Sequence, residues 1–350
     1  MRLVSLNKLA GGERLARPIM TDSYQELLAA GTELKPEYIE KIKQLGINEV
    51  MIDDGKLSPE QVLILRDEVE TKIKAEVREI LERHIYSNTE ELKELSKTAD
   101  LIITEILSND EVIEQIYDIS ERSADIYEHS INVCSLSILV AAKLGSAKED
   151  IHDLGVACIF HDIGLRYLDF KYTNIRMEEF GPKEVIEYRK HPVYGYAALE
   201  KEDWLSDKSK VMILQHHERL DGTGFPIHPK DMMQESKILQ TVDAFDEMIC
   251  GIGCERCKVY EAVEYLKIFR GVRYSDKIVE TLLEFTAVFP AGTVVKLSNG
   301  EGGIVIRQNK QFPERPIIKI TTDRSGQPCR GEKIVNLLDE RSVFINEVLS

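Results

Sequence analysis

The sequence predicts a mainly α-helical protein, in which one long all-helical domain is flanked by a small N-terminal α+β module and a small C-terminal β-rich module. Three observations predict this fold class. Residues 90–288 follow a helical apolar pattern almost throughout, with glycine and proline confined to a few loops. Residues 1–55 alternate short apolar runs with turn signals instead. Residues 290–350 contain strand-like runs, two of them joined by an Asn-Gly pair.

The N-terminal α+β module is predicted over residues 1–55. Its strand-like runs cover residues 16–20, 27–30 and 49–52. A short helix is expected from Lys35 to Leu45, because the glycine that follows is a helix-stop signal. Interaction or dimerisation is the default role for such a module.

Residues 56–100 are predicted to form a helical connector. Ser58-Pro59-Glu60-Gln61 has the form of a helix start, with serine as the cap, proline in the first turn and glutamine placed to return a hydrogen bond. An amphipathic helix to about Glu82 is expected, since apolar residues recur at spacings of three and four: Val62, Leu65, Val69, Ile73, Val77 and Ile80. This apolar stripe either packs on the next domain or forms a dimer seam.

The main helical domain is predicted over residues 101–288, and the β-rich module over residues 289–350. In that module, residues 293–297 and 303–306 are expected to be strands joined by a turn at Asn299-Gly300. Residues 316–321 add a further strand. The chain shows no internal repeat and no low-complexity tract.

Charge and composition exclude several classes of protein. The 350 residues include 45 lysines and arginines against 61 acidic residues, a net charge of −16. That balance argues against binding along a long nucleic acid, so a phosphate-bearing ligand needs a local site, where a bound cation can supply positive charge. No run of 18 apolar residues predicts a membrane span, and no signal peptide is evident. Six cysteines are too few for a disulfide scaffold, so a cytoplasmic protein is expected.

Histidines and aspartates within the helical domain are candidate metal ligands. The eight histidines include members of two adjacent pairs, His161-Asp162 and His216-His217. Imidazoles together with carboxylates are the ligands of Fe, Mn, Zn or Ni. A single histidine is more often an ordinary core or surface residue, so what favours a metal centre is the order of the whole set. That set, in chain order, is Asp125, His129, His161, Asp162, His191, His216, His217 and Asp243.

Together these segments resemble the HD-GYP family, a branch of the HD metal-dependent phosphohydrolases. The resemblance covers Glu121 to Leu283. The segments that carry it are His129-Ser130-Ile131-Asn132-Val133, His161-Asp162-Ile163-Gly164, His191-Pro192, residues 216–226 (HHERLDGTGFP) and Val242-Asp243-Ala244-Phe245-Asp246. The loop that gives the family its name reads GFP here in place of GYP.

The resemblance implies an HD-type phosphohydrolase domain that hydrolyses the bacterial second messenger cyclic di-GMP to pGpG, GMP or both, through a hydroxide that bridges two metals. Two or three divalent ions are implied, with Fe or Mn expected. His161 and Asp162 would be the catalytic residues, with Asp162 bridging two ions. The implied metal ligands are His129, His161, Asp162, His191, His216, His217 and Asp243, with Asp125 for a third ion. The implied substrate-binding residues are Gly222, Gly224, Phe225, Pro226, Arg256 and Lys258.

The expected partners follow from the same resemblance. They are cyclic di-GMP or a related nucleotide, a second copy of the chain in a homodimer, and a diguanylate cyclase of the GGDEF class. No long nucleic acid and no membrane are expected.

The chain departs from the family pattern near the metals. The family usually has lysine after His-Asp-Ile-Gly, and here that residue is Leu165. Because leucine donates no hydrogen bond, one source of transition-state stabilisation is absent, worth about 2.7–4 kcal/mol in other enzymes. An arginine that many members place after the last aspartate is Ile252 here, and Arg256 or Lys258 is expected to compensate. Residues 166–182 do not reproduce the family's loop.

These departures keep two alternatives open. One is a weakly active or inactive metal-bound module that senses cyclic di-GMP. The other is a phosphohydrolase of another nucleotide.

Three cysteines near the end of the helical domain have the spacing of a cluster-binding motif. Cys250-x3-Cys254-x2-Cys257 matches the pattern with which radical-SAM enzymes hold an iron–sulfur cluster. The alternating strands and helices of such an enzyme do not follow in the sequence. Ordinary thiols in the phosphohydrolase domain are therefore the preferred interpretation.

Overall fold

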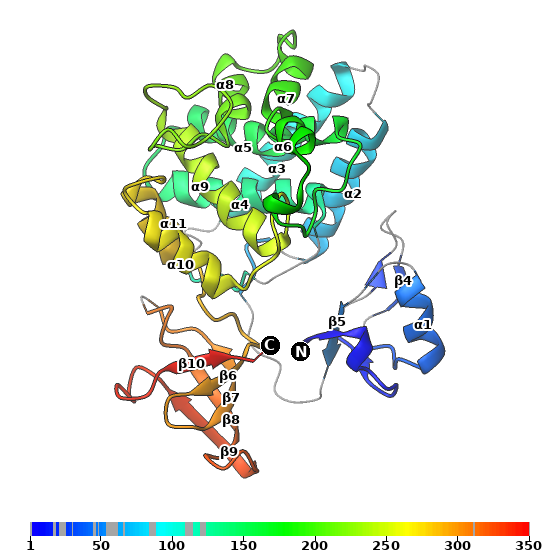
Figure 1. The fold of residues 1–350 in the computed structure, drawn as a ribbon, viewed down its shortest axis with the longest axis vertical. Helices are drawn as coiled ribbons and strands as arrows, with labels where there is room; N and C mark the ends of the chain where they lie inside the picture. The colour runs from blue at the N-terminus through cyan, green and yellow to red at the C-terminus, as the bar shows by residue number, and fades with distance from the viewer. Residues whose placement is uncertain are drawn as a thin grey trace. The chain divides into compact units, whose positions relative to one another are not determined.

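The computed structural model consists of two compact units (Figure 1). It describes residues 2–16, 19–20, 26–29, 31–44, 47, 49–53, 62–65, 67–83, 89–108, 115–119, 124–310 and 312–349. One unit is helical and spans Leu63–Val288, and the other contains both terminal segments, Met1–Val62 and Phe289–Ser350. The mainly α-helical fold class is confirmed. The boundaries of the four segments expected from the sequence stay predictions.

The N-terminal segment contains strands and one helix, as expected for an α+β module. Its antiparallel sheet has the order β1 (Arg2–Ser5), β5 (Glu49–Asp53) and β2 (Arg14–Leu15), and β3 (Ile19–Met20) pairs with β4 (Glu26–Leu28). The expected helix is α1 (Pro36–Gln44). Its apolar face buries Ile39 and Ile42 in a core shared with Leu15, Leu34 and Ile52.

The connector helix packs within the helical unit. It forms α2 (Asp67–Arg83), which lies against α3 (Thr89–Leu107) and α4 (Ile126–Lys143). Ile73 and Val77 of the predicted apolar stripe are almost fully buried there. Packing on the next domain therefore accounts for the stripe. The predicted helix start at Ser58–Gln61 lies outside the described residues.

The centre of the helical unit is formed by α4, α5 and α9 (Figure 1). Helix α4 packs against both of the others, α3 and α8 cover α5, and α7 packs on α8 and on the 3-10 turn η3. The remaining bounds are α5 (Lys148–Phe160), η3 (Ile163–Tyr167), η4 (Met177–Glu179), α6 (Pro182–Tyr188), α7 (His191–Leu199), α8 (Asp207–Gln215), α9 (Gln234–Cys250), α10 (Val259–Phe269) and α11 (Asp276–Phe285).

The C-terminal segment forms an antiparallel five-stranded sheet in the order β10-β6-β7-β8-β9. Its strands are β6 (Val294–Leu297), β7 (Gly302–Arg307), β8 (Ile317–Thr322), β9 (Pro328–Asn336) and β10 (Ile345–Val348). The first three match the predicted strands, and Gly300 takes a positive φ of 90° in the predicted turn. Strands β9 and β10 were missed, because their polar residues hide the alternation that marks a half-buried strand.

Within the described part of the chain, no helix is long and apolar enough to cross a membrane.

Candidate metal centre

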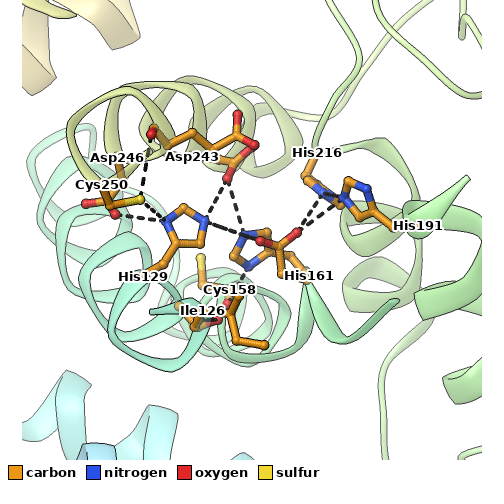
Figure 2. A network of polar contacts seen from close by, with 12 residues as sticks. Ile126, His129, Cys158, His161, His191, His216, Asp243, Asp246 and Cys250 are labelled. Atoms are coloured by element: carbon orange, nitrogen blue, oxygen red, sulfur yellow. Dashed lines mark hydrogen bonds and ion pairs between the residues drawn. The ribbon is translucent and has the colours of Figure 1, made fainter. Parts of the chain in front are cut away.

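The helical unit gathers five histidines and two aspartates from separate elements into one buried cluster. His129 lies on α4, His161 follows α5, His191 begins α7, His216 follows α8, and Asp243 lies on α9. Asp162 and His217 are the neighbours of two of these residues. All seven side chains belong to residues that are at most 3% exposed. Figure 2 shows the labelled members pointing toward one another from different helices.

One group of donor atoms consists of His129, His161 and Asp243. The two imidazole Nε2 atoms lie 3.1 Å apart. Asp243 Oδ1 lies 3.1 Å from the Nε2 of His129 and 3.3 Å from that of His161. The three donor atoms therefore converge on one point.

A second group consists of Asp162, His191, His216 and His217. The Nε2 atom of His191 lies 3.0 Å from that of His216 and 3.1 Å from that of His217. Each of these nitrogens faces its neighbours rather than a separate hydrogen-bond partner.

Asp162 connects the two groups, with one carboxylate oxygen toward each. Its Oδ2 lies 3.5 Å from His129 Nε2 and 3.6 Å from His161 Nε2. Its Oδ1 lies 3.2 Å from His191 Nε2 and 3.5 Å from His216 Nε2. A carboxylate placed in this way could bridge two cations, one in each group.

The far nitrogens of three histidines are held by backbone carbonyls. The Nδ1–H of His161 donates to Cys158 O, that of His191 to Tyr188 O and that of His216 to Ile213 O, each at 2.7 Å. A hydrogen at Nδ1 leaves the lone pair of the neutral ring on Nε2. These three rings therefore direct lone pairs toward the centre.

That arrangement fits metal ions better than it fits hydrogen bonds. Two Nε2 lone pairs about 3 Å apart repel each other, because neither carries a hydrogen to donate. In addition, Asp162 Oδ2 and Asp243 Oδ2 are buried and make no hydrogen bond with any residue that the structure describes. A cation between the facing acceptors satisfies both features, so the donor chemistry fits divalent metals that take imidazole and carboxylate ligands.

Electrostatics favour the ligating form for some of these side chains, whereas neighbouring carboxylates outweigh burial and raise the pKa of His129 and of His161. Burial lowers the pKa of His216 and lowers that of His217 well below its usual value. Burial alone would raise the pKa of Asp162, but the nearby His161, His191 and His216 outweigh it and hold that pKa well below normal. The aspartate is therefore ionised and the two imidazoles are neutral.

Comparison with known proteins agrees with this architecture. A model of the HD domain family matches residues 111–278, and a model of a KOW domain associated with HD domains matches residues 294–350. The described helices of the first segment bring the histidine and aspartate pattern into one centre. The helical segment is an HD domain of the HD-GYP type.

The relatives and structural neighbours of the HD-GYP segment are distant. The chain is 25% identical to a cyclic di-GMP phosphodiesterase of Pseudomonas aeruginosa, over 69% of this chain and 59% of that protein. It is 26% identical to one of Thermotoga maritima, over 57% of this chain and 58% of that one. The chain thus spans less than two thirds of either relative. An HDGYP protein of Bdellovibrio bacteriovorus shares the fold, with a TM-score of 0.55, 19% identity, and coverage of 80% of this chain and 97% of that one.

The HD-GYP centre includes two carboxylates that the sequence analysis did not select. Asp246 Oδ2 lies 2.8 Å from His129 Nδ1, so it orients this ring as the backbone carbonyls orient the others. Glu247 Oε1 lies 3.7 Å from His217 Nε2 and accepts a hydrogen bond from Tyr188. Burial and the charge of Asp243 raise the pKa of Glu247 well above normal. Asp246 and Glu247 lie three and four residues after Asp243 on the same helix. This spacing was the sequence signal that could have identified them.

Asp125 belongs to none of the groups of close donors among the described residues, and its role as a ligand of a third ion stays a prediction. Its carboxylate is the N-cap of α4 and accepts hydrogen bonds from the backbone N–H groups of Tyr127 and Glu128, at 2.9 and 3.1 Å. It also lies 3.9 Å from Arg78.

The loop of Gly222, Gly224, Phe225 and Pro226 lies against the second donor group. The Phe225 ring stacks on the imidazole of His217, with centroids 4.7 Å apart. At Gly224 a side chain would collide with the backbone of Arg219, so glycine is required for this close approach. Gly222 takes a positive φ of 74°. The loop thus braces one predicted ligand, and its contact with substrate stays a prediction.

Arg256 and Lys258 stay predictions as substrate contacts too. The backbone N–H of Arg256 donates to Asn174 Oδ1 at 3.1 Å, and that of Lys258 donates to Glu261 Oε2 at the start of α10. Neither residue belongs to a group of candidate metal donors.

The departures from the family pattern meet in one apolar cluster, defined by Leu165, Phe180, Tyr188, Cys250 and Ile252 with Phe225 packed against it. Leu165 and Ile252 are almost fully buried in it. At the two positions where the family usually has a lysine and an arginine, this chain therefore has apolar side chains, and both belong to the same apolar cluster.

The three cysteines near the end of α9 do not form a cluster site. The thiols of Cys250 and Cys254 both donate to Glu247 O, at 3.6 and 3.4 Å. Among the described residues, no group of close metal donors contains all three sulfurs. Ordinary thiols fit this arrangement.

Proposed function

We propose that this chain is a metal-dependent phosphodiesterase that hydrolyses cyclic di-GMP to pGpG, GMP or both. The observation that carries the proposal is the pair of buried donor groups that share Asp162. The relatives named above, both cyclic di-GMP phosphodiesterases, support the same substrate. An acidic chain can hold such a dianionic ligand only where local positive charge exists, and the two donor groups provide for it.

Each donor group would hold one divalent cation. The first would be held by His129, His161, Asp162 and Asp243, and the second by Asp162, His191, His216 and His217. When bound, two such cations neutralise a phosphodiester, lower the pKa of a water and stabilise the leaving oxygen. Iron and manganese are the proposed metals, because both accept imidazole and carboxylate ligands.

The protein's own contribution is orientation. Asp246 and backbone carbonyls each hold one nitrogen of a histidine imidazole, so that the other nitrogen faces the centre. Little side-chain conformational freedom is therefore lost when a cation binds. Asp162 sets the spacing of the two sites through the two oxygens of one carboxylate. Phe225 holds His217 in place by stacking on it.

A second function, a slow or inactive sensor of cyclic di-GMP, is favoured by the apolar cluster around Leu165. This cluster supplies no hydrogen-bond donor where the family uses lysine, and the residues of the two donor groups are almost fully buried. Comparing turnover of the native chain with Leu165→Lys separates the two functions. A gain of about 10²–10³ would identify the native centre as catalytically handicapped.

Other expectations stay proposals on the same basis. They are a cytoplasmic location, a homodimer, and a partner of the GGDEF class.

The decisive experiment combines metal analysis of protein purified without oxygen with chromatography of cyclic di-GMP and its products. The native chain is expected to contain metal and to cleave the substrate. Asp162→Asn is expected to lose both properties, whereas Asp339→Asn, at an exposed position of the C-terminal segment, retains them. Metal-loaded protein that neither binds nor cleaves cyclic di-GMP would refute the proposal. A substrate panel led by another nucleotide would refute the substrate alone.

A further inference from the structure

The buried metal centre reaches the surface beside His217. Five of the seven residues in the two donor groups are fully buried, whereas Asp162 and His217 are each 3% exposed. The ring of Phe225 lies against this edge of the centre, stacked on the imidazole of His217 with centroids 4.7 Å apart. Phe225 is itself partly exposed. A substrate that approaches the centre therefore meets the surface around Phe225.

Arg189 brings a positive charge to this surface. Its guanidinium carbon lies 5.8 Å from the centroid of the Phe225 ring, and the residue is exposed. Its backbone N–H donates to Val185 O at 3.1 Å, at the end of α6. The carbonyl of the preceding residue, Tyr188, accepts the hydrogen bond that orients His191. The arginine is thus anchored two residues before a candidate metal ligand.

The guanidinium of Arg189 forms no ion pair with any residue that the structure describes. The two glutamates of α6 are engaged elsewhere. Glu184 accepts a hydrogen bond from the N–H of Gly181 at 2.7 Å, and Glu187 pairs with Lys190 at 2.8 Å. Contact with an aromatic ring leaves the N–H groups of a guanidinium available as donors. An arginine held in this way is suited to bind a phosphate through two parallel hydrogen bonds.

Other positions near the centre do not supply this charge. Leu165 and Ile252 belong to the apolar cluster. The side chain of Arg219 donates to two backbone carbonyls and lies over the ring of Tyr274. Arg189 therefore provides a cationic side chain that the apolar cluster lacks.

The position of Arg189 suits a phosphate that is not being cleaved. Among the described residues, its side chain makes no polar contact with either donor group, and it approaches the second group through the Phe225 ring. A cyclic dinucleotide carries two phosphodiesters on opposite sides of one ring. When one of them binds at the metal ions, the other lies away from them. A contact with that second phosphate strengthens binding without depending on the bond that breaks.

We propose that Arg189 binds the second, uncleaved phosphate of a cyclic dinucleotide. The proposal rests on the proposed function and adds a residue that selects a substrate with two phosphates over one with a single phosphate.

The test is steady-state kinetics of the metal-loaded full chain with two substrates. Cyclic di-GMP has two phosphates, and bis-p-nitrophenyl phosphate has one. Arg189→Met, which keeps an apolar stem beside Phe225, is expected to raise the KM for cyclic di-GMP about 10–100-fold and to change kcat little, because a hydrogen-bonded charge is lost away from the reacting phosphate. The KM for bis-p-nitrophenyl phosphate is expected to stay at the native value.

Two further variants separate the charge of Arg189 from general effects. Arg189→Lys should recover part of the loss for cyclic di-GMP, because lysine keeps the charge but not the paired donors. Lys183→Met removes an exposed charge from α6 and is the matched control that keeps both KM values. Metal content is measured for every variant, and dissociation constants replace KM where turnover is too slow to follow.

The outcomes separate this proposal from the previous one. An unchanged KM for cyclic di-GMP in Arg189→Met would overturn the role of Arg189 and leave the phosphodiesterase proposal standing. An equal rise for both substrates, or the same rise in Lys183→Met, would also overturn it, because the loss would not depend on a second phosphate at Arg189. A native chain that takes up metal but neither binds nor cleaves cyclic di-GMP would overturn both proposals together.

Discussion

Replacing Asp246 by asparagine is expected to weaken metal binding at the first donor group by about 10–100-fold. Asp246 and His129 are both fully buried, and the carboxylate lies 2.8 Å from the far nitrogen of this ring, much closer than the Cys250 thiol at 4.0 Å. A hydrogen bond to a charged group contributes roughly 1.5–3 kcal/mol. That range corresponds to about 10–100-fold in a binding constant, since about 1.4 kcal/mol equals tenfold.

The affinity for metal is measured by titrating metal-free protein with Mn²⁺ in a calorimeter. Only the equivalent held by His129 should weaken, because the second donor group keeps all of its carbonyl anchors. Asp339→Asn in the C-terminal segment is the control. Unchanged affinity in Asp246→Asn would show that the carboxylate does not orient the ring, and equal weakening of every equivalent would show a global effect instead.

Three further predictions concern other parts of the chain. In the same titration, Phe225→Tyr should keep the metal affinity of the native chain, and Phe225→Ala should lower it severalfold. The reason is that only the alanine variant loses the stacking of this ring on His217. Equal affinities of the two variants would contradict this prediction. The Cys158 thiol should resist iodoacetamide at pH 8 in folded protein and react after denaturation, since burial raises its pKa to about 12; labelling of the native form at the denatured rate would contradict it. Lys333→Met should destabilise the C-terminal sheet more at pH 7 than at pH 3, as measured by urea unfolding. The reason is that Lys333 lowers the pKa of Glu301, so this stabilisation is present above the usual glutamate pKa and disappears as pH falls through the lowered value; a pH-independent difference would refute it.

The helical pattern and the ligand order predicted much of the molecule from sequence alone. Amphipathic spacing is a local property, so α1 and the strands around Asn299-Gly300 were predicted near their observed bounds. The motif predicted seven residues that the fold does bring together. Their role as ligands stays a proposal.

What the sequence missed depends on contacts between helices. Asp246 meets His129 only because α9 packs on α4, and no spacing along the chain contains that fact. Asp125 is the N-cap of α4, a local role that the sequence analysis did not assign, and its role as a ligand stays a prediction. The meeting of Leu165, Ile252 and Phe225 in one cluster likewise emerges only in three dimensions.

The backbone carbonyls that accept hydrogen bonds from His161, His191 and His216 affect the electrostatic field at the metal centre. Each anchor belongs to the residue three positions earlier, in the last turn of α5, α6 or α8. Three helices therefore end at the cluster, and the carboxyl end of a helix carries a partial negative charge of roughly half an electron. These helix ends are buried, so dissolved salt screens their attraction for cations only weakly. Metal affinity should therefore depend little on ionic strength.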